Sequence, residues 1–103
     1  MEIKKGLNKF VIVDENRILM GEIIYEIDHN NTILAKKTFV NPVHRGLGLA
    51  RILVDTLVAE ARLRGQKIVP CCSYVYKTFV ENKEYQDVWD QNPNKKNISC
   101  SIS

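Results

Sequence analysis

The amino-acid sequence predicts one α/β domain, an α+β arrangement on a mixed sheet with the element order βββαβα. Three short apolar segments separated by polar turns open the chain and predict an antiparallel meander. A long segment with the apolar spacing of a helix follows. The next short apolar segment follows that helix, so its strand should pair parallel with an earlier one. The 103 residues leave room for one hydrophobic core.

The strands of the meander are expected at residues 10–13, 17–27 and 32–40. Each segment is rich in aliphatic or aromatic residues, which favour extended structure. The clusters at 14–16 and 28–31 contain Asp and Asn, which are typical of turns. Short turns of this kind join antiparallel neighbours, so these strands should lie side by side.

The long helix is expected over residues 46–64, where one face is apolar: Ala50, Leu53, Val54, Leu57, Val58 and Ala61. Gly65 follows at the position where helix ends favour a left-handed residue. Residues 67–72 predict the parallel strand. Residues 73–82 predict a second helix, for which Thr78 with Glu81 offers a competing later start. From residue 90 on, Gln, Asn, Lys and Ser dominate, so we expect a domain over 1–89 and a flexible tail over 90–103.

Composition narrows the class of protein without fixing its partner. Hydrophobic residues make up 45% of the chain and charged residues 26%, as in ordinary globular proteins. The net charge of +3 suits an anionic small molecule as well as a nucleic acid. No segment has the ~20 apolar residues of a membrane span, the first nine residues lack the apolar core of a signal peptide, and no metal-ligand spacing occurs. The odd count of cysteines (Cys71, Cys72 and Cys100), two of them adjacent, favours reduced thiols and a cytoplasmic location.

The most informative segment is residues 40–51, where a strand leads through a glycine-containing loop into the long helix. The first backbone N–H groups of a helix have no partner inside it, and residues 44–49 include no Ser, Thr, Asp or Asn to cap them. Gly46 and Gly48 have no side chain that could block a ligand. Arg45 and Arg51 add positive charge at the positive end of the helix dipole. Together these features predict a phosphate-binding site.

A helix start that is simply solvated is the alternative, with Asn41 as its cap and Pro42 in the first position. The loop is not a Walker A motif, because no Gly-Lys-Ser/Thr follows. It is not a dinucleotide-binding fingerprint either, because the third glycine is missing and a hairpin meander precedes it. On these grounds alone, both interpretations of the helix start remain open.

Arg45-Gly-Leu-Gly48-Leu-Ala50 resembles the Arg/Gln-x-x-Gly-x-Gly/Ala signature of the GNAT superfamily of N-acetyltransferases. More narrowly, the chain resembles a short GNAT-like family whose members carry a Cys-Ser-Tyr-Val segment and then a Glu-Tyr-x-Asp segment. Here these are Cys72-Ser-Tyr-Val75 and Glu84-Tyr-Gln-Asp87. The resemblance extends from about Lys9 to Val88.

The resemblance implies that the chain binds acetyl-CoA (coenzyme A). The backbone amides of the loop would hold the pyrophosphate, and the end of the third strand would bind the pantetheine arm. The acetyl group would lie between that strand and the strand at 67–72. The implied cofactor-binding residues are Phe39, Val40, Arg45, Gly46, Leu47, Gly48, Leu49, Ala50 and Arg51, with Tyr74 as a further candidate in the cofactor slot.

Cys72 matches the cysteine of the family and is the candidate catalytic residue, either as the site of an acyl intermediate or beside a direct attack. Because neighbours on a strand point to opposite faces, we expect Cys72 in the slot and Cys71 in the core. The alternative is that both are small buried hydrophobic residues. The family often has a histidine before the threonine of the third strand, where this chain has Lys37. That difference weakens a cysteine–histidine pair here and favours direct attack or another base.

Two functions follow as hypotheses. The first is an acetyl-CoA-dependent N-acetyltransferase that acts on an unidentified amine. Its candidate general acids are Tyr74, Tyr76 and Tyr85, although aromatic residues in such positions usually pack in cores. The second is a coenzyme A-binding protein with little or no turnover, because the chain lacks the helices that usually build an acceptor groove. A nucleic-acid partner is disfavoured, because the strands lack stacking aromatic residues. No membrane partner is expected. The sequence leaves open the identity of the acceptor and the oligomeric state, for which a monomer is one option.

Overall fold

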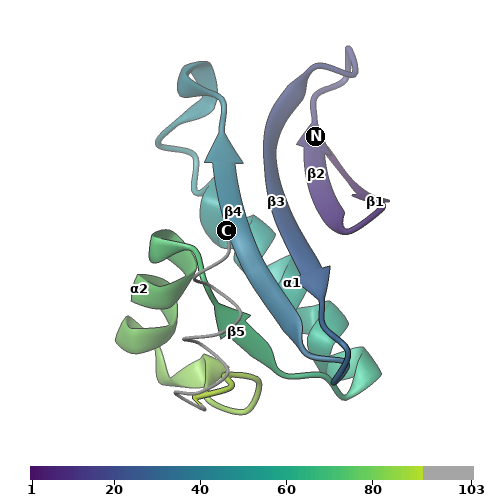
Figure 1. Cartoon of the computed structure of the whole chain (residues 1–103). Helices are drawn as coiled ribbons and strands as arrows, with labels where there is room; N and C mark the ends of the chain where they lie inside the picture. The colour runs from purple at the N-terminus through teal and green to yellow at the C-terminus, as the bar shows by residue number, and fades with distance from the viewer. Residues whose placement is uncertain (92–103) are drawn as a thin grey trace.

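The computed structural model describes residues 1–91 and places them around one five-stranded sheet (Figure 1). The spatial order of the strands follows the chain: β1 (Glu2–Gly6), β2 (Lys9–Val13), β3 (Leu19–Ile27), β4 (Ile33–Val40) and β5 (Ile68–Pro70). The first four strands pair antiparallel, and β5 lies parallel to β4. The mixed sheet predicted from the sequence is therefore confirmed.

Two helices pack against this sheet, α1 (Leu49–Arg64) and α2 (Ser73–Glu81), and two short 3-10 helices, η1 (Pro42–His44) and η2 (Lys83–Tyr85), flank them. In Figure 1, α1 lies behind β3 and β4, and α2 lies beside β5. The buried face of α1 meets the inward side chains of the strands to form the hydrophobic core, whose burial is the main favourable contribution to folding. The buried residues of α1 are Leu49, Leu53, Val54, Leu57, Val58 and Ala61.

The strand β1 was missed by the sequence analysis, so the order of elements is ββββαβα. Its side chains are exposed except at half-buried Gly6, so they show no alternation of apolar and polar residues. Its backbone pairs with β2, from Glu2 opposite Val13 to Gly6 opposite Lys9. Lysines on such an edge strand discourage pairing with another chain.

The turns that join β2 to β3 and β3 to β4 are each closed by an aspartate. Asp14 Oδ1 accepts from the N–H groups of Asn16 and Ile18, at 2.8 and 2.9 Å. Asp28 Oδ1 accepts in the same way from the second and fourth residues after it, both at 2.9 Å. The turns therefore extend further than expected, and Arg17, with a φ of 64°, belongs to the first turn and not to a strand.

The helices also differ from expectation at their ends. α1 begins at Leu49 and not at residue 46, because Gly46 and Gly48 have positive φ values of 89° and 73°. Gly65, with a φ of 66°, ends α1 as predicted. In α2, Thr78 lies inside the helix and its hydroxyl donates to Tyr74 O at 2.8 Å, so the competing later start is wrong.

The end of the described chain returns to β5. Trp89 forms an isolated parallel bridge with Ile68, and Asp90 N donates to Ile68 O at 2.8 Å. The Trp89 ring also contacts the rings of Tyr76 and Phe79 edge-on. Most of the tail expected at 90–103 lies outside the described residues. Within residues 1–91, no helix has the length and apolar character needed to cross a membrane.

Candidate functional site

The strands β4 and β5 separate soon after they pair. Their parallel register ends with Ala35 opposite Pro70. The N–H groups of Cys71 and Cys72 both donate to Ala35 O, at 3.0 and 2.9 Å, and the chain then turns into α2. Because β4 continues to Val40, its last five residues have no strand on this side within the described chain.

The free edge of β4 presents the backbone groups of alternate residues. Asn41 N donates to Met20 O at 2.8 Å, which makes these two residues a hydrogen-bonded pair with β3. Hydrogen-bonded and non-hydrogen-bonded pairs alternate in antiparallel ladders, so Val40, opposite Gly21, is not bonded to β3. The N–H and C=O groups of Val40 therefore point to the open edge, whereas those of Phe39 point to β3.

The start of α1 lies beyond the end of this edge and is not capped. Gly48 occupies the N-cap position without a side-chain hydrogen bond, and the first turn contains no acidic residue. The N–H groups of residues 46–51 donate to no acceptor within residues 1–91, whereas the next one, of Ile52, donates to Gly48 O at 3.2 Å. Asn41, the alternative cap, instead accepts from Val43 N at 3.1 Å and so caps η1. The helix start thus offers a row of free donors at the positive end of a 16-residue helix.

The two loop glycines keep the space beside these donors open. A Cβ atom added to Gly46 or to Gly48 would meet no atom of the chain within 4 Å. Packing therefore does not require glycine at either position. The positive φ values do favour it, and the missing side chains leave room for a ligand to approach the backbone.

A cavity of about 380 Å³ opens between this loop, the end of β4 and the start of α2. Seven of the ten residues predicted to bind a cofactor line it: Val40, Arg45, Gly46, Gly48, Leu49, Ala50 and Tyr74. Its lining is mostly apolar apart from the backbone donors, His44 and Arg45. His44 also lines the cavity but was not among the predicted site residues, although its position directly before the loop indicated it.

The other three predicted residues lie outside the cavity lining. Leu47 is largely exposed in the loop. Phe39 is half-buried, with its backbone directed to β3. The guanidinium of Arg51 is turned to the C-terminal segment, where Nε donates to the Tyr85 hydroxyl at 2.5 Å and Nη2 to Glu84 Oε1 at 2.7 Å. Only the backbone N–H of Arg51 therefore belongs to the row of free donors.

Cys72 lies where β4 and β5 separate. Its Sγ is 3.6 Å from Thr38 Oγ1 on β4, it packs against the hydrophobic core, and its thiol is free. The expectations for Cys71 are wrong, because it is half-buried and not in the core, and because it is disulfide-bonded. Lys37 is exposed, so it lacks the burial that a role as a neutral base would require.

The Glu84-Tyr-Gln-Asp87 segment ties the end of the chain to α1 and does not line the cavity. The buried Tyr85 hydroxyl donates to Asp55 Oδ1 at 2.5 Å. Its burial, together with this hydrogen bond, raises the pKa of Tyr85 to about 12. Asp87 binds Arg62 through two hydrogen bonds of 2.8 and 3.0 Å, and hydrogen bonding to Arg62 is the main cause of the lowered pKa of its carboxyl. The segment is therefore structural, and Tyr85 is not placed to act as a general acid.

Comparison with known proteins gives one consistent result. The family described as GCN5-related N-acetyl-transferase matches the chain over residues 9–88. The solved structure of a GCN5-like candidate N-acetyltransferase from Staphylococcus aureus is 36% identical, with a TM-score of 0.69, and the match covers 86% of this chain and 87% of that one. No curated protein matches the chain.

Two longer solved structures share the fold. A nourseothricin acetyltransferase is 27% identical with a TM-score of 0.51, over 58% of this chain and 36% of its own. A candidate acetyltransferase from Pyrococcus furiosus is 26% identical with a TM-score of 0.51, over 71% of this chain and 55% of its own. The chain therefore spans about a third and about half of these two proteins.

Proposed function

The chain belongs to the family of GCN5-related N-acetyltransferases, and from that premise we propose that it transfers an acetyl group from acetyl-CoA to an amine. The observation that carries the proposal is the row of unoccupied N–H donors at residues 46–51, which opens on a cavity. A diphosphate offers the negative charge and the acceptor oxygens that these donors lack.

The residues present fit coenzyme A in three respects. The donors at the start of α1 suit its pyrophosphate, and the guanidinium of exposed Arg45 adds positive charge at the same place. The free N–H and C=O groups of Val40 suit the amides of the pantetheine arm, which would extend the sheet at the open edge of β4. The apolar lining, including Tyr74, suits the remainder of the arm.

The thioester end of the arm would then lie near Cys72 and Thr38, where β4 and β5 separate. Acetyl-CoA supplies an activated acetyl group. A neutral amine attacks the carbonyl carbon, so that a C–N bond forms while the C–S bond breaks, and the departing thiolate takes the proton that the nitrogen loses. The thiol of Cys72 is placed either to accept the acetyl group first or to line the slot during direct attack.

Two experiments separate these two roles of Cys72: detection of an acetyl adduct on the protein, and substitution of Cys72 by alanine. An acyl intermediate predicts that intact-protein mass spectrometry detects one added acetyl group after acetyl-CoA treatment, and that Cys72→Ala abolishes turnover. Without an adduct, and with full activity in Cys72→Ala, the intermediate is excluded and direct attack remains. The matched control is Ser73→Ala, which alters the exposed residue on the other side of Cys72 and leaves the disulfide of Cys71 intact.

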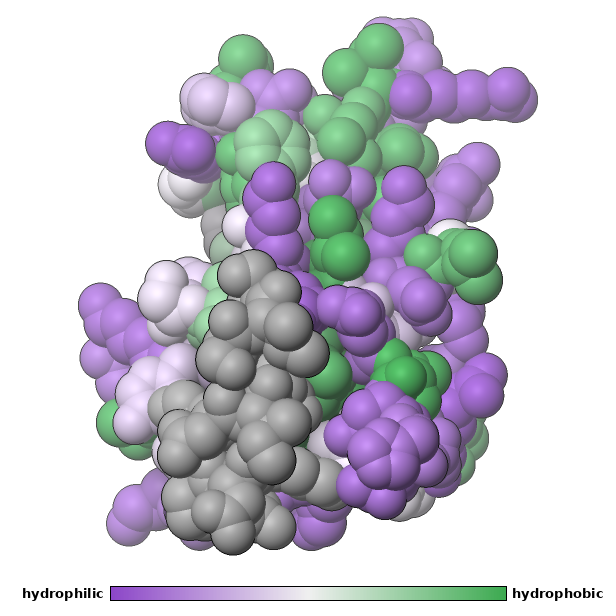
Figure 2. Space-filling model, viewed as in Figure 1, coloured by the Kyte–Doolittle hydropathy of each residue, from purple (hydrophilic) through white to green (hydrophobic). Residues whose placement is uncertain are grey.

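A second candidate function is coenzyme A binding with little or no turnover. It is favoured by the short connection between β2 and β3, because within residues 1–91 no helix lies over the face of the sheet opposite α1. Outside the grey atoms, Figure 2 shows a mixture of hydrophilic and hydrophobic side chains on this face. Helices within the described residues therefore form no wall of an acceptor groove on this face.

One assay discriminates between the two functions. The whole chain is incubated with acetyl-CoA and a panel of amines that includes peptide N-termini, a lysine side chain and polyamines, and free thiol is measured over time. An acetyltransferase releases thiol faster with at least one amine than without any. If the chain binds acetyl-CoA but no amine accelerates thiol release, the transferase proposal fails and the binding function replaces it.

A further inference from the structure

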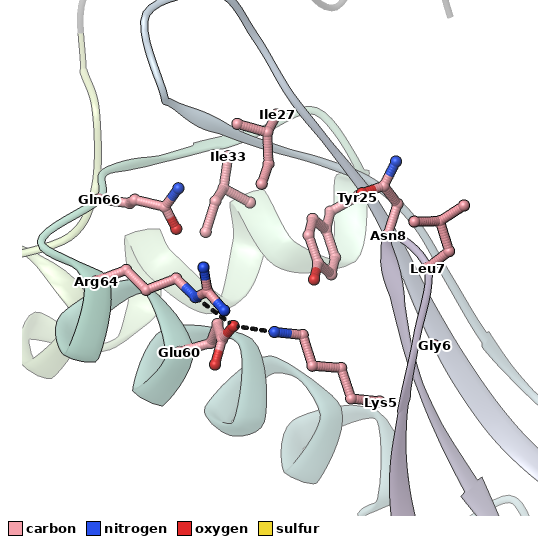
Figure 3. Close-up of a pocket in the computed structure, with 10 residues that line it drawn as sticks. All are labelled: Lys5, Gly6, Leu7, Asn8, Tyr25, Ile27, Ile33, Glu60, Arg64 and Gln66. Carbon is pink, nitrogen blue, oxygen red and sulfur yellow. Dashed lines mark hydrogen bonds and ion pairs between the residues drawn. The ribbon is translucent and has the colours of Figure 1, made fainter.

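A second cavity lies at the far end of α1 from the cofactor cavity. It has a volume of about 150 Å³ and lies between the turn that joins β1 to β2, the end of β3 and the last turns of α1 (Figure 3). Ala50 lines the first cavity and Arg64 lines this one. At 1.5 Å per residue along the helix they are about 21 Å apart, so this cavity is separate from the proposed transfer site.

One side chain in this cavity has an unfulfilled hydrogen-bonding requirement. Gln66 is 6% exposed, and its Oε1 has no hydrogen-bond partner. Its Nε2 donates to Asn31 Oδ1 at 2.8 Å, which fixes the orientation of the amide. Figure 3 shows the amide extending into the space between Ile33 and Arg64, with its oxygen on the side of Arg64. A buried acceptor without a donor is costly, so a molecule that donates to it would bind favourably.

The wall formed by α1 and the end of β1 carries charged groups with donors to spare. Lys5 Nζ and Arg64 Nε both bind the same oxygen of Glu60, Oε2, at 2.5 and 2.7 Å. The hydrogen bond from Lys5 is the main cause of a lowered pKa for Glu60, which therefore stays ionised. An ammonium has three donors and a guanidinium five, so most donors of both cations stay available. Two cations beside one carboxylate leave this wall with a net positive charge.

The rest of the cavity is mostly apolar, with Asn8 and the hydroxyl of Tyr25 as further polar groups. Ile33 is fully buried, the Tyr25 ring forms a further wall, and Ile27 is partly exposed at the rim. A cavity of about 150 Å³ is in the size range that takes benzene, so it suits a molecule of roughly six to eight non-hydrogen atoms. A ligand for this cavity is therefore small and has a donor, an anionic group and a short apolar part.

We propose that this cavity binds a free aliphatic α-amino acid. The ammonium donates to Gln66 Oε1, the carboxylate accepts from Lys5 and Arg64, and the side chain lies against Ile27 and Ile33. A zwitterion of this kind satisfies the unpaired acceptor and the spare donors together. A simple amine would add a third cation to the wall, and a simple carboxylate would leave Gln66 Oε1 unpaired.

Nuclear magnetic resonance of the whole 15N-labelled chain tests this proposal, with L-valine as the probe. Isobutylamine and isobutyrate are the matched controls, because each keeps the apolar part and one of the two charged groups. The proposal predicts saturable amide shifts with L-valine, centred on Gly6, Asn8 and Gln66. For either control, the apparent affinity obtained from the concentration dependence of these shifts should be lower by about tenfold or more.

Two substitutions sharpen the test. Gln66→Met keeps the length of the side chain and removes the acceptor, so the affinity for L-valine should fall about tenfold or more. Gln86→Met, at an exposed glutamine, is the matched control and should leave the affinity unchanged. Because loss of the bond to Asn31 could unfold the first variant, Arg64→Met serves as a second test on an exposed side chain and should also weaken binding.

Several results would overturn the proposal. These are the absence of shifts with L-valine at millimolar concentration, equal shifts with isobutylamine or isobutyrate, or shifts centred on residues 45–51. Unchanged affinity in both folded variants would overturn it as well. None of these results bears on acetyl transfer, because the cofactor cavity shares no lining residue with this one.

Discussion

Replacing Gly48 by glutamate should remove coenzyme A binding while the protein stays folded. The Cβ at this position faces open space, so the new side chain meets no atom of the chain. It would enter the region where the pyrophosphate is expected and place a carboxylate beside the N–H donors of residues 46–51. Gly65→Glu is a matched control, because Gly65 has a similar φ of 66° and equally open space at the other end of the same helix.

The expected loss of coenzyme A affinity differs in size from the expected loss of folding stability. Hydrogen bonds to a charged group contribute about 1.5–3 kcal/mol each, so loss of only two of them costs about 3–6 kcal/mol, or roughly a hundredfold to ten-thousandfold in affinity. The left-handed backbone conformation costs each variant about 1–2 kcal/mol of folding stability. A glutamate at Gly48 also faces the positive end of the helix dipole, whereas one at Gly65 faces the negative end. Gly65→Glu should therefore be the less stable variant but the better binder.

Isothermal titration calorimetry with coenzyme A gives the affinities, and urea denaturation gives the free energies of unfolding. The expected order is loss of binding in Gly48→Glu and affinity near that of the wild type in Gly65→Glu. If Gly48→Glu is folded and binds within about threefold of the wild type, the amides at the helix start do not hold the ligand. Equal loss of affinity in both variants would attribute the effect to destabilisation.

Three further outcomes are expected. Tyr85→Phe should lower the free energy of unfolding by about 1 kcal/mol, because Asp55 and Arg51 lose a buried hydroxyl partner; a loss no larger than that in Tyr25→Phe would contradict this. The pKa of Tyr85 is about 12 in the folded state, above its ordinary value of 10.0, so the wild type should lose stability as the pH rises from about 10 to about 12. Tyr85→Phe should lose less stability over the same range, and urea denaturation at each pH measures both losses. The pKa of Glu60 is lowered, so its ionised carboxylate stabilises the fold above the ordinary pKa of 4.5, and this stabilisation is lost as the pH falls through the folded-state pKa. The free energy of unfolding of Glu60→Gln should therefore change less between neutral and acid pH than that of the wild type. Parallel changes in the two proteins would refute this.

Elements with a side-chain signature could be predicted from the sequence. The apolar face of α1 has helical spacing, and Gly65 marks its end, so both were found. β1 carries no such signature, because its side chains are exposed and its stability comes from backbone pairing with β2. Backbone hydrogen bonds do not depend on residue type, so an edge strand of this kind is not visible in the sequence alone.

At the start of α1, the free backbone amides were predicted correctly, but the first residue of the helix was not. The absence of a capping side chain and the paired glycines predicted free amides, and the structure has them. The helix nevertheless begins three residues later than predicted, because both glycines adopt positive φ values. Glycine is compatible with a helix and with a left-handed turn, so the sequence could not decide between them.

The orientations of side chains were the least predictable part of the site. Arg51 was expected at the ligand because of its charge and position, yet it binds Glu84 and Tyr85 from the C-terminal segment. These partners lie more than thirty residues away in the chain. The pairing depends on how η2 packs against α1, and spacing within a sequence contains no information about it. For the same reason, the unpaired oxygen of Gln66 emerged only from the folded structure.

The most direct test of the proposed function is a residue-resolved titration of the 15N-labelled chain with acetyl-CoA and, separately, with coenzyme A. A diphosphate held by the start of α1 predicts that both ligands shift the amide signals of residues 46–51 and of Val40 most strongly, and that only the signals near Cys72 differ between the two ligands. If the amide signals of residues 46–51 stay in place while either ligand binds elsewhere, the helix start is not the coenzyme A site.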